Sequence, residues 1–285
     1  MLLGAHMSIA GGYYRAIEGA VEEGCDCVQL FTKNNNQWAA KDLTDEDVCR
    51  FKEAADKHRQ TVRHTLSHAS YLINLAAPDK ELWEKSIDAF VIELQRAELL
   101  GIPYVVLHPG AYTTSSEKRG IRRIIWALDR VHKRLPECTS QCLLETTAGQ
   151  GTSLGCRFEH LAQVMDGIKA PERVGVCIDS CHIFAAGYPL GTEEEYTATM
   201  SQFESLVGFE RLQAFHLNDS KKELGSRVDR HENIGEGFLG LEPFRFLMND
   251  SRFEHVPMYI ETPKKERDGV SGDVWNLSRL RGLIE

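Results

Sequence analysis

Short apolar segments with alternating inward and outward positions recur along the whole chain. They begin at Leu2, Cys27, Thr61, Tyr104, Gln141, Val174, Leu212 and Pro257. In LQAFHL, the seventh of them, Leu212, Ala214 and His216 share one face, as the two-residue period of a β-strand requires. The first and the last segment begin 255 residues apart over seven intervals, or about 36 residues each. Each segment is therefore predicted to be a short strand in a regular series.

Amphipathic helical patterns fill the intervals between these strands. Apolar residues at helical spacing predict a helix over residues 79–101, ended by Gly101, and another over residues 121–135. Thr192 followed by Glu195 has the sequence of a capping box, which predicts that a helix begins there. Shorter helical patterns cover residues 45–59, 158–168, 241–248 and 274–284.

Strand and helix alternate eight times without a linker or a low-complexity segment. This order predicts an α/β fold, a single (β/α)₈ TIM barrel spanning residues 1–285 as one domain, rather than two doubly wound sheets. Barrels of this class run to about 250 residues, which the chain length accommodates. Because such barrels place their active sites at the carboxyl ends of the strands, those positions carry the functional prediction.

Composition and charge limit the class of protein. No apolar run approaches the roughly 18 residues of a membrane span, and the first residues are too few for a signal sequence, so we expect an intracellular protein without a membrane partner. The eight cysteines contain no Cys-x-x-Cys pair, and most are expected to be buried thiols. A net charge of −9 argues against nonspecific nucleic-acid binding over the whole surface but leaves a local basic patch open.

Residues of the metal-ligand type stand at the ends of six predicted strands: His68, His108, Glu145, Asp179, His216 and Glu261. The residues two positions earlier are apolar or small, as the interior of a barrel requires: Leu66, Val106, Leu143, Cys177, Ala214 and Tyr259. Three further candidates are His182, three residues after Asp179, and the Asp229 and His231 pair in the polar loop after the seventh strand. Together they make five imidazoles and four carboxylates that converge on one site.

Such a set of buried groups indicates bound cations. Unpaired buried charges cost several kcal/mol each, and no comparable set of inward lysines or arginines is visible on the strands. Mixed histidine and carboxylate donors favour zinc, with manganese or iron as substitutes. Nine ligands exceed the need of one tetrahedral ion, and three ions fit if one carboxylate bridges two of them. Three divalent cations against four carboxylates leave a local charge of about +2, which would attract an anion such as a phosphodiester.

The other histidines and the basic residues near the active face are assigned roles other than metal binding. His6 and His64 face inward on their strands and are expected to hydrogen-bond to ligands rather than to bind metal. The remaining histidines are interpreted as surface or packing residues: His58, His132, His160 and His255. Basic residues near the predicted active face are candidates for phosphate contacts: Lys33, Arg157, Lys221, Lys222, Arg227 and Arg230.

Several motifs closely resemble one family, endonuclease IV, the zinc-dependent apurinic/apyrimidinic endonucleases of base-excision repair. They are SHASYLINL, LHPG, ETTAGQG, GVCIDSCHIFAAGY, HLNDSK, GSRVDRHENIGEG and ETP, with GAHMSIAGG and FTKNNNQW near the start of the chain. The match runs from end to end with nearly equal spacing. It covers all nine candidate ligands.

The resemblance implies three zinc ions per chain, distributed over the nine residues. His68 and His108 would bind one ion, Asp179, His216 and Glu261 a second, and His182, Asp229 and His231 the third, with Glu145 bridging the first two. Glu145 and Glu261 are the expected catalytic carboxylates. Tyr71 and Leu72 would wedge into the duplex at the lesion, a known way to kink DNA. The further expected DNA contacts are Lys33, Asn36, Arg227 and Arg230, and Asn36 stands where the family usually has an arginine.

The activity implied is cleavage of the DNA backbone 5′ to an abasic site, leaving a 3′-hydroxyl and a 5′-deoxyribose phosphate, with trimming of blocked 3′ ends. The resemblance implies a three-zinc mechanism using a metal-bridging hydroxide. The expected partner is duplex DNA with abasic sites or blocked 3′ ends, bound by a monomer in the cytoplasm beside nucleoid DNA, or in the nucleus of a eukaryote.

Two other classes of function stay open at this point. A metal-dependent sugar isomerase or epimerase has the same barrel architecture, and fold alone does not separate the two enzymes. The third ligand group and the Tyr71–Leu72 tip favour the nuclease, because a sugar enzyme needs neither a third ion nor a wedge. A non-enzymatic metal-binding module is the remaining class.

Overall fold

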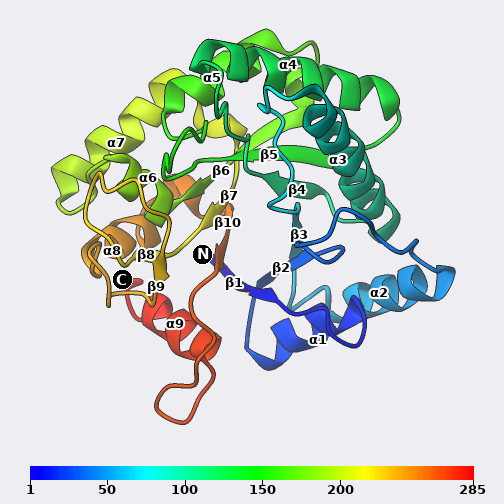
Figure 1. The fold of residues 1–285 in the computed structure, drawn as a ribbon. Helices are drawn as coiled ribbons and strands as arrows, with labels where there is room; N and C mark the ends of the chain where they lie inside the picture. The colour runs from blue at the N-terminus through cyan, green and yellow to red at the C-terminus, as the bar shows by residue number, and fades with distance from the viewer.

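Eight parallel strands close into a barrel in the computed structural model, which describes all 285 residues (Figure 1). Around the barrel the order is β1-β10-β7-β6-β5-β4-β3-β2. The barrel strands are β1 (Leu2–Met7), β2 (Cys27–Phe31), β3 (His64–His68), β4 (Tyr104–Leu107), β5 (Gln141–Glu145), β6 (Val174–Asp179), β7 (Leu212–His216) and β10 (Pro257–Ile260). The predicted TIM barrel and all eight predicted strands are confirmed.

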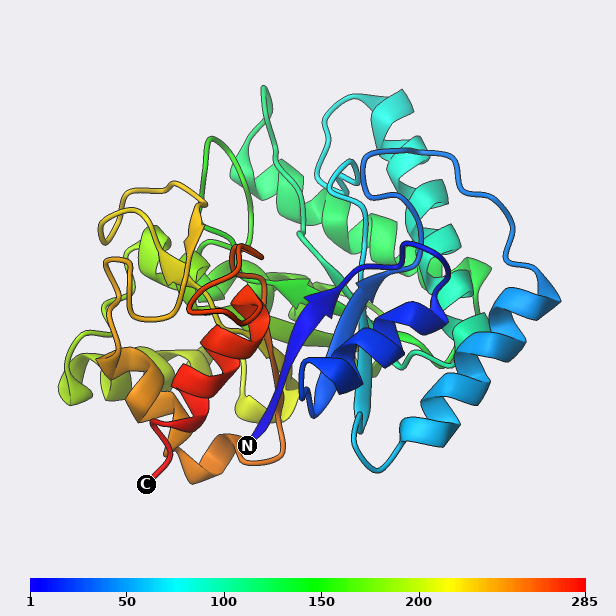
Figure 2. The ribbon, with the colours of Figure 1, turned by 90° about the horizontal axis from the view of Figure 1, so that it is seen from below.

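Helices surround the barrel on its outside (Figure 2). They are α1 (Tyr14–Glu22), α2 (Asp45–His58), α3 (Lys80–Leu100), α4 (Glu117–Arg134), α5 (Phe158–Gly167), α6 (Ser180–Ala186), α7 (Glu193–Leu206), α8 (Glu242–Met248) and α9 (Gly272–Arg281). Three 3₁₀ turns are η1 (Pro171–Arg173), η2 (Phe209–Arg211) and η3 (Ser251–Phe253). The capping box of Thr192 and Glu195 and the glycine stop at Gly101, which has a φ of 77°, are confirmed. None of the helices combines the length and hydropathy needed to cross a membrane.

Two helices and one small sheet were not predicted from the sequence. α1 buries Ala16, Ile17 and Ala20 against the barrel. α6 lies over the barrel mouth with nearly every residue buried, so its seven residues carry no amphipathic pattern. A two-stranded antiparallel sheet, β8 (Asp219–Ser220) with β9 (His231–Glu232), stands apart from the barrel and folds the long loop after β7 back on itself.

The core has two parts, one between strands and helices and one inside the barrel. The outer part is a continuous cluster of 64 buried residues. The inner part is a cluster of Cys27, Leu66, Val106, Leu143, Cys177, Ala214 and Tyr259. Six of these seven are the residues predicted to line the interior, which confirms the inward face of each strand. The next inward position along each strand therefore lies at the barrel mouth. Five of the eight cysteines are buried and all are free thiols.

Candidate active site

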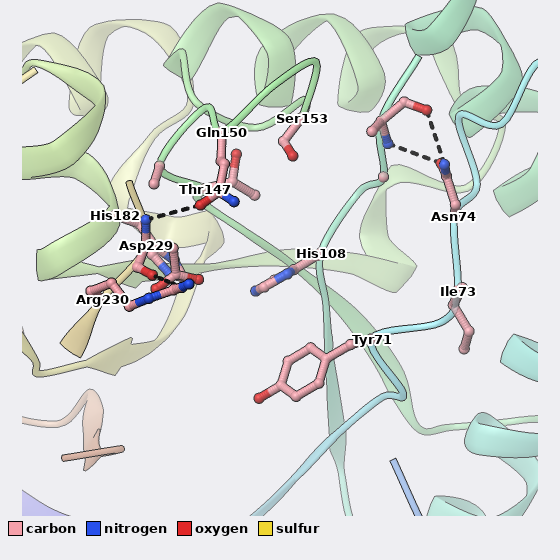
Figure 3. Close-up of a pocket in the computed structure, with 13 residues that line it drawn as sticks. Tyr71, Ile73, Asn74, His108, Thr147, Gln150, Ser153, His182, Asp229 and Arg230 are labelled. Carbon is pink, nitrogen blue, oxygen red and sulfur yellow. Dashed lines mark hydrogen bonds and ion pairs between the residues drawn. The ribbon is translucent and has the colours of Figure 1, made fainter. Parts of the chain in front are cut away.

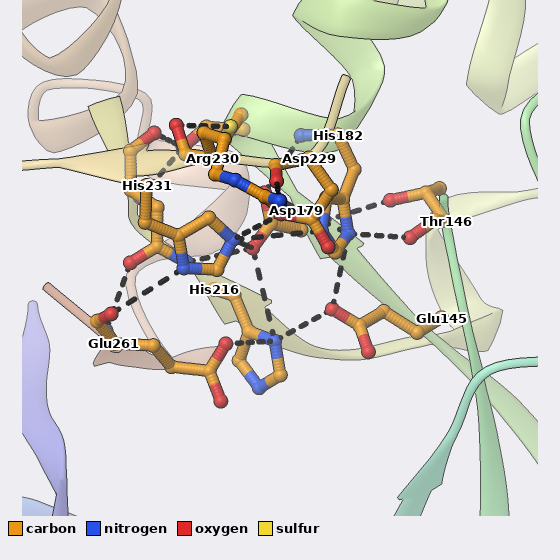
Figure 4. A network of polar contacts seen from close by, with 12 residues as sticks. Glu145, Thr146, Asp179, His182, His216, Asp229, Arg230, His231 and Glu261 are labelled. Carbon is orange, nitrogen blue, oxygen red and sulfur yellow. Dashed lines mark hydrogen bonds and ion pairs between the residues drawn. The ribbon is translucent and has the colours of Figure 1, made fainter. Parts of the chain in front are cut away.

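The candidate ligands meet at the carboxyl mouth of the barrel, around Glu145 at the end of β5 (Figure 4). Oε2 of this fully buried carboxylate lies 3.1 Å from His68 Nε2 and 2.9 Å from His108 Nε2. Oε1 lies 2.9 Å from His216 Nδ1 and 3.3 Å from His182 Nδ1. The two oxygens thus face different sets of imidazoles. This arrangement suits a carboxylate shared between two cation positions.

A second group of donors joins β6, β7 and β10 beside Glu145. Asp179 and His216 end their strands, and Glu261 directly follows β10. His216 Nδ1 lies 3.5 Å from Glu261 Oε2 and 4.0 Å from Asp179 Oδ2. Because β6, β7 and β10 are consecutive neighbours in the parallel sheet, their carboxyl ends bring these three side chains together.

A third group is built by α6 and the loop that ends in β9. Asp179 caps α6 by accepting a hydrogen bond from the His182 backbone N at 2.8 Å, which places His182 at the mouth. Asp229 Oδ2 lies 3.1 Å from His182 Nε2, and its Oδ1 lies 3.2 Å from His231 Nε2. The pairing of β8 with β9 brings His231, distant in the chain from α6, into this group.

Backbone carbonyls orient several of the imidazoles. His68 Nδ1 lies 2.8 Å from the Ala69 carbonyl, and His182 Nδ1 lies 2.9 Å from the Thr146 carbonyl. Because a carbonyl oxygen only accepts, Nδ1 carries a hydrogen in each ring. Nε2, which faces a carboxylate oxygen in both rings, is therefore the nitrogen available to bind a metal ion.

Two buried amides at the mouth were missed by the sequence reasoning. Gln29 Oε1 lies 2.7 Å from His216 Nε2, and its Nε2 donates to Glu261 Oε1 at 2.6 Å and to His6 Nδ1 at 2.8 Å. Asn218 Nδ2 donates to an Asp179 oxygen at 2.7 Å. The strand alternation could have predicted Gln29, because it lies two residues after the inward-facing Cys27 and so shares the inward face of β2. His6 was expected to hydrogen-bond to a candidate ligand; its Nδ1 instead accepts from the amide of Gln29, which in turn contacts His216 and Glu261.

Opposite charges dominate the electrostatics of the mouth. Burial opposes the charged form of Glu145, but the imidazoles of His108 and His216 hold its pKa well below the usual range. Burial likewise opposes protonation of His231, yet Asp179 and Asp229 raise its pKa to about 9. Glu145 therefore stays ionised, and a proton on His231 would have to leave before that ring nitrogen could bind a metal ion.

The donor atoms fall into three groups that fit divalent ions. In each group the ligand atoms lie within 4.8 Å of one another: His68, His108 and Glu145; Glu145, Asp179, His216 and Glu261; and His182, Asp229 and His231. Cys181 forms a fourth overlapping group with Asp179 and His231, but burial raises its pKa to about 12, and a protonated thiol is a poor ligand. Nitrogen and carboxylate oxygen donors in such sets are typical of zinc and related metals.

Comparisons with known proteins show which family the chain belongs to. A family model described as a xylose isomerase-like TIM barrel matches residues 17–279. A curated protein from Citrifermentans bemidjiense, "Probable endonuclease 4", is 50% identical over 284 residues, which cover 100% of this chain and 99% of the relative. The chain belongs to the endonuclease IV family. Another member, from Geobacter sulfurreducens, is 51% identical over 285 residues, with 99% of this chain and 94% of the relative covered.

Solved structures separate the endonuclease IV family from its fold relatives. Endonuclease IV from Thermus thermophilus superposes with a TM-score of 0.85 at 34% identity, covering 99% of this chain and 98% of that one. A D-tagatose 3-epimerase-like protein has a TM-score of 0.73 at 17% identity, covering 99% of this chain and 97% of that one, and shares the fold alone. The chain is thus an enzyme of the endonuclease IV type, and the sugar epimerase alternative has only the barrel in its favour.

A cavity of about 350 Å³ opens beside the candidate metal-ligand groups of this endonuclease IV enzyme (Figure 3). His108, His182 and Asp229 reach into it, and Tyr71 and Arg230 line its edge. Tyr71 is 52% exposed, while its ring centroid lies 5.1 Å from that of His68 and 5.7 Å from that of His108. The rim of the cavity therefore carries an aromatic side chain directly above the candidate ligands.

Most of the expected DNA contacts lie at the surface, and one does not. Asn36, Arg227 and Arg230 are exposed, and Leu72 is half-buried next to Tyr71. Lys33 is only 5% exposed; its Nζ donates to the Gln37 carbonyl at 2.7 Å and lies 3.5 Å from Glu93 Oε1. The expectation that Lys33 contacts DNA is therefore wrong, because its ammonium is buried and contacts Gln37 and Glu93.

Proposed function

We propose that this apurinic/apyrimidinic endonuclease cleaves the phosphodiester 5′ to an abasic site in duplex DNA. The products would be a 3′-hydroxyl and a 5′-deoxyribose phosphate, and the same site would trim blocked 3′ ends. The observation that carries the proposal is the set of three donor groups, two of which share Glu145, beside an open polar cavity. A phosphodiester in that cavity would lie against the ligand side chains.

Zinc is the metal we propose, with three ions per chain and manganese or iron as substitutes. His68 and His108 would hold one ion, Asp179, His216 and Glu261 another, and Glu145 would be shared between them. His182, Asp229 and His231 would hold the third. When bound, divalent ions lower the pKa of water and neutralise charge on phosphate oxygens.

The protein's own residues would contribute orientation and exclusion of water. Glu145, buried and contacted on both oxygens, keeps the two neighbouring donor groups at one separation. Gln29 and the backbone carbonyls hold the imidazole nitrogens toward the mouth. Below them, the closed layer around Leu143 and Tyr259 keeps bulk water from the underside of the site. Such a prearranged set of charges loses little energy to reorganisation during reaction.

DNA recognition is proposed for the rim. Tyr71 lines the cavity and is exposed, with the half-buried Leu72 beside it; both would fill the gap left by the missing base, offsetting part of the cost of unstacking. Arg227 and Arg230 are exposed near the same edge and would contact phosphates. All candidate ligands come from one chain, so a monomer suffices, and we propose that it acts in the cytoplasm where DNA is present.

An incision assay tests this function. A duplex with a single tetrahydrofuran abasic analogue should be nicked once, on the 5′ side, leaving an end that a DNA polymerase extends. Chelator should abolish the nick and added zinc restore it, while a matched undamaged duplex stays intact. Metal-dependent epimerisation of a ketose without incision would instead establish the sugar enzyme.

A further inference from the structure

A buried polar cluster lies behind the rim, outside the candidate metal groups. It consists of Glu93 on α3, Thr32 and Lys33 after β2, and Ser70 after β3. The loop from β2 to α2 spans residues 32–44, and the loop from β3 to α3 spans residues 69–79. Neither loop contains a helix or a strand, and the second carries Tyr71 and Leu72. Loops of this length need contacts beyond their own backbone to keep one conformation.

One carboxylate contacts both loops. Glu93 Oε1 accepts a hydrogen bond from the Ser70 backbone N at 3.0 Å and lies 3.5 Å from Lys33 Nζ. Glu93 Oε2 accepts from Thr32 Oγ1 at 3.0 Å. Every polar partner of Glu93 is therefore on one of the two loops, so α3 is the support to which both are attached.

The loops are also joined directly to each other. Ser70 Oγ donates to the Asn35 carbonyl at 2.5 Å, and the Leu72 backbone N donates back to Ser70 Oγ at 3.3 Å. Lys33 Nζ donates to the Gln37 carbonyl at 2.7 Å, which closes the first loop on itself. Contacts thus run from Glu93 through Ser70 to the residue beside Tyr71.

The burial of the ion pair between Lys33 and Glu93 indicates that it fixes one arrangement of the two loops. The Lys33 and Glu93 side chains are 3% and 1% exposed. A buried ion pair is often no more stabilising than apolar residues of the same volume, but it specifies one arrangement because either charge alone is strongly unfavourable there. A contact of this kind suits a segment that must keep its shape while exposed to solvent.

We propose that Glu93 and Lys33 are positioning residues that hold both loops in the DNA-binding arrangement before DNA arrives. Their ion pair holds Tyr71 and Leu72 in place beside the cavity. The entropic cost of ordering these side chains is therefore met when the protein folds and does not reduce the free energy of DNA binding. This inference rests on the proposed function, since it takes Tyr71 and Leu72 to enter the duplex.

The test compares Glu93→Gln and the double variant Lys33→Met/Glu93→Gln with wild type. Glu84→Gln is the matched control, because Glu84 is also on α3 and forms an ion pair with Arg130 at 2.7 Å, but an exposed one. The readouts are KM and kcat for the abasic duplex, hydrolysis of bis(4-nitrophenyl) phosphate, zinc content, and amide hydrogen exchange in residues 32–44 and 69–79.

Both variants should raise KM for the duplex by about tenfold, the effect of loops that must order on binding. Amide exchange should become faster in both loops, while zinc content and hydrolysis of the small phosphodiester remain within about twofold of wild type, because the metal groups keep their own supports. The Glu84→Gln control should match wild type in every readout.

Unchanged exchange and unchanged KM would overturn the inference. An equal loss of small-substrate hydrolysis, zinc and duplex incision would also overturn it, since the cluster would then support the metal centre or the whole fold. If Glu93→Gln does not fold, the double variant and Thr32→Val, which unpairs no charge, decide through the same readouts. A wild type that fails to incise the duplex contradicts the proposed function, whereas loop exchange still tests the ion pair.

Discussion

Replacing Gln29 with leucine should weaken metal binding while leaving the barrel folded. The substitution is similar in volume and removes three hydrogen bonds, to His216, Glu261 and His6. His216 is fully buried, so its Nε2–H would lose its acceptor with no water to replace it. The imidazole would then be free to rotate or to move its proton to Nδ1, the nitrogen that faces Glu145.

The size of the effect follows from these contacts. A buried donor left without a partner costs about 1–3 kcal/mol. Removing an orienting partner of a metal ligand typically costs about 10–100-fold in metal affinity, equivalent to about 1.4–2.8 kcal/mol. We therefore expect the Kd of one zinc ion, the one proposed to bind Asp179, His216 and Glu261, to rise by about 10–100-fold. The other two ions should be retained.

The assay is a zinc titration of the metal-free protein against a chromophoric chelator, with thermal unfolding to measure the fold. Ser140→Ala is the control, because the buried Ser140 hydroxyl donates to the Ile102 carbonyl at 2.7 Å just before β5, at the opposite end of the barrel. It should lower stability by about 1 kcal/mol without changing zinc affinity. Equal zinc affinity in Gln29→Leu and wild type, or an equal loss in the control, would refute the reasoning.

Three other perturbations have definite expected outcomes. Glu145→Gln should lower abasic-site incision by orders of magnitude with the fold retained; a rate within a few-fold of wild type means that Glu145 is not shared between two ions. Tyr71→Ala/Leu72→Ala should lower duplex incision at least about tenfold, or ~1.4 kcal/mol, and spare zinc content and small-phosphodiester hydrolysis; normal duplex incision excludes the wedge. Burial and Arg173 lower the pKa of His132 to about 4, so the neutral folded ring stabilises the protein above pH ~6.5 and this contribution is lost as pH falls toward 4. In urea unfolding, lowering the pH from 7 to 4 should therefore raise the free energy of unfolding of His132→Leu relative to that of wild type by about 2 kcal/mol, after allowance for partial solvent screening. A difference in the free energy of unfolding that does not change with pH contradicts this.

The barrel and the inward face of its strands could be predicted from local sequence. Strand alternation repeats every two residues because of backbone geometry, so a ligand at a strand end and an apolar residue two positions before it must share a face. That is why the sequence alone places Glu145 with Leu143, and Asp179 with Cys177, on the inward face of their strands. The convergence of the six strand-end ligands likewise needed only the order of the strands, because the carboxyl ends of parallel strands meet at one mouth.

The partners of individual polar groups were decided only by the tertiary structure. Gln29 meets His216 and Glu261 because closure of the barrel brings β2 near β7 and β10, and no spacing in the chain encodes that approach. The sequence predicts that Lys33 is a cation on a loop at the active face. In the structure it is buried in an ion pair with Glu93, 60 residues away on α3. Local periodicity reports which face of an element is buried. The pairing of polar groups that are distant in the chain depends on long-range packing. A buried charge needs a partner, and only the closed fold determines which group lies beside it.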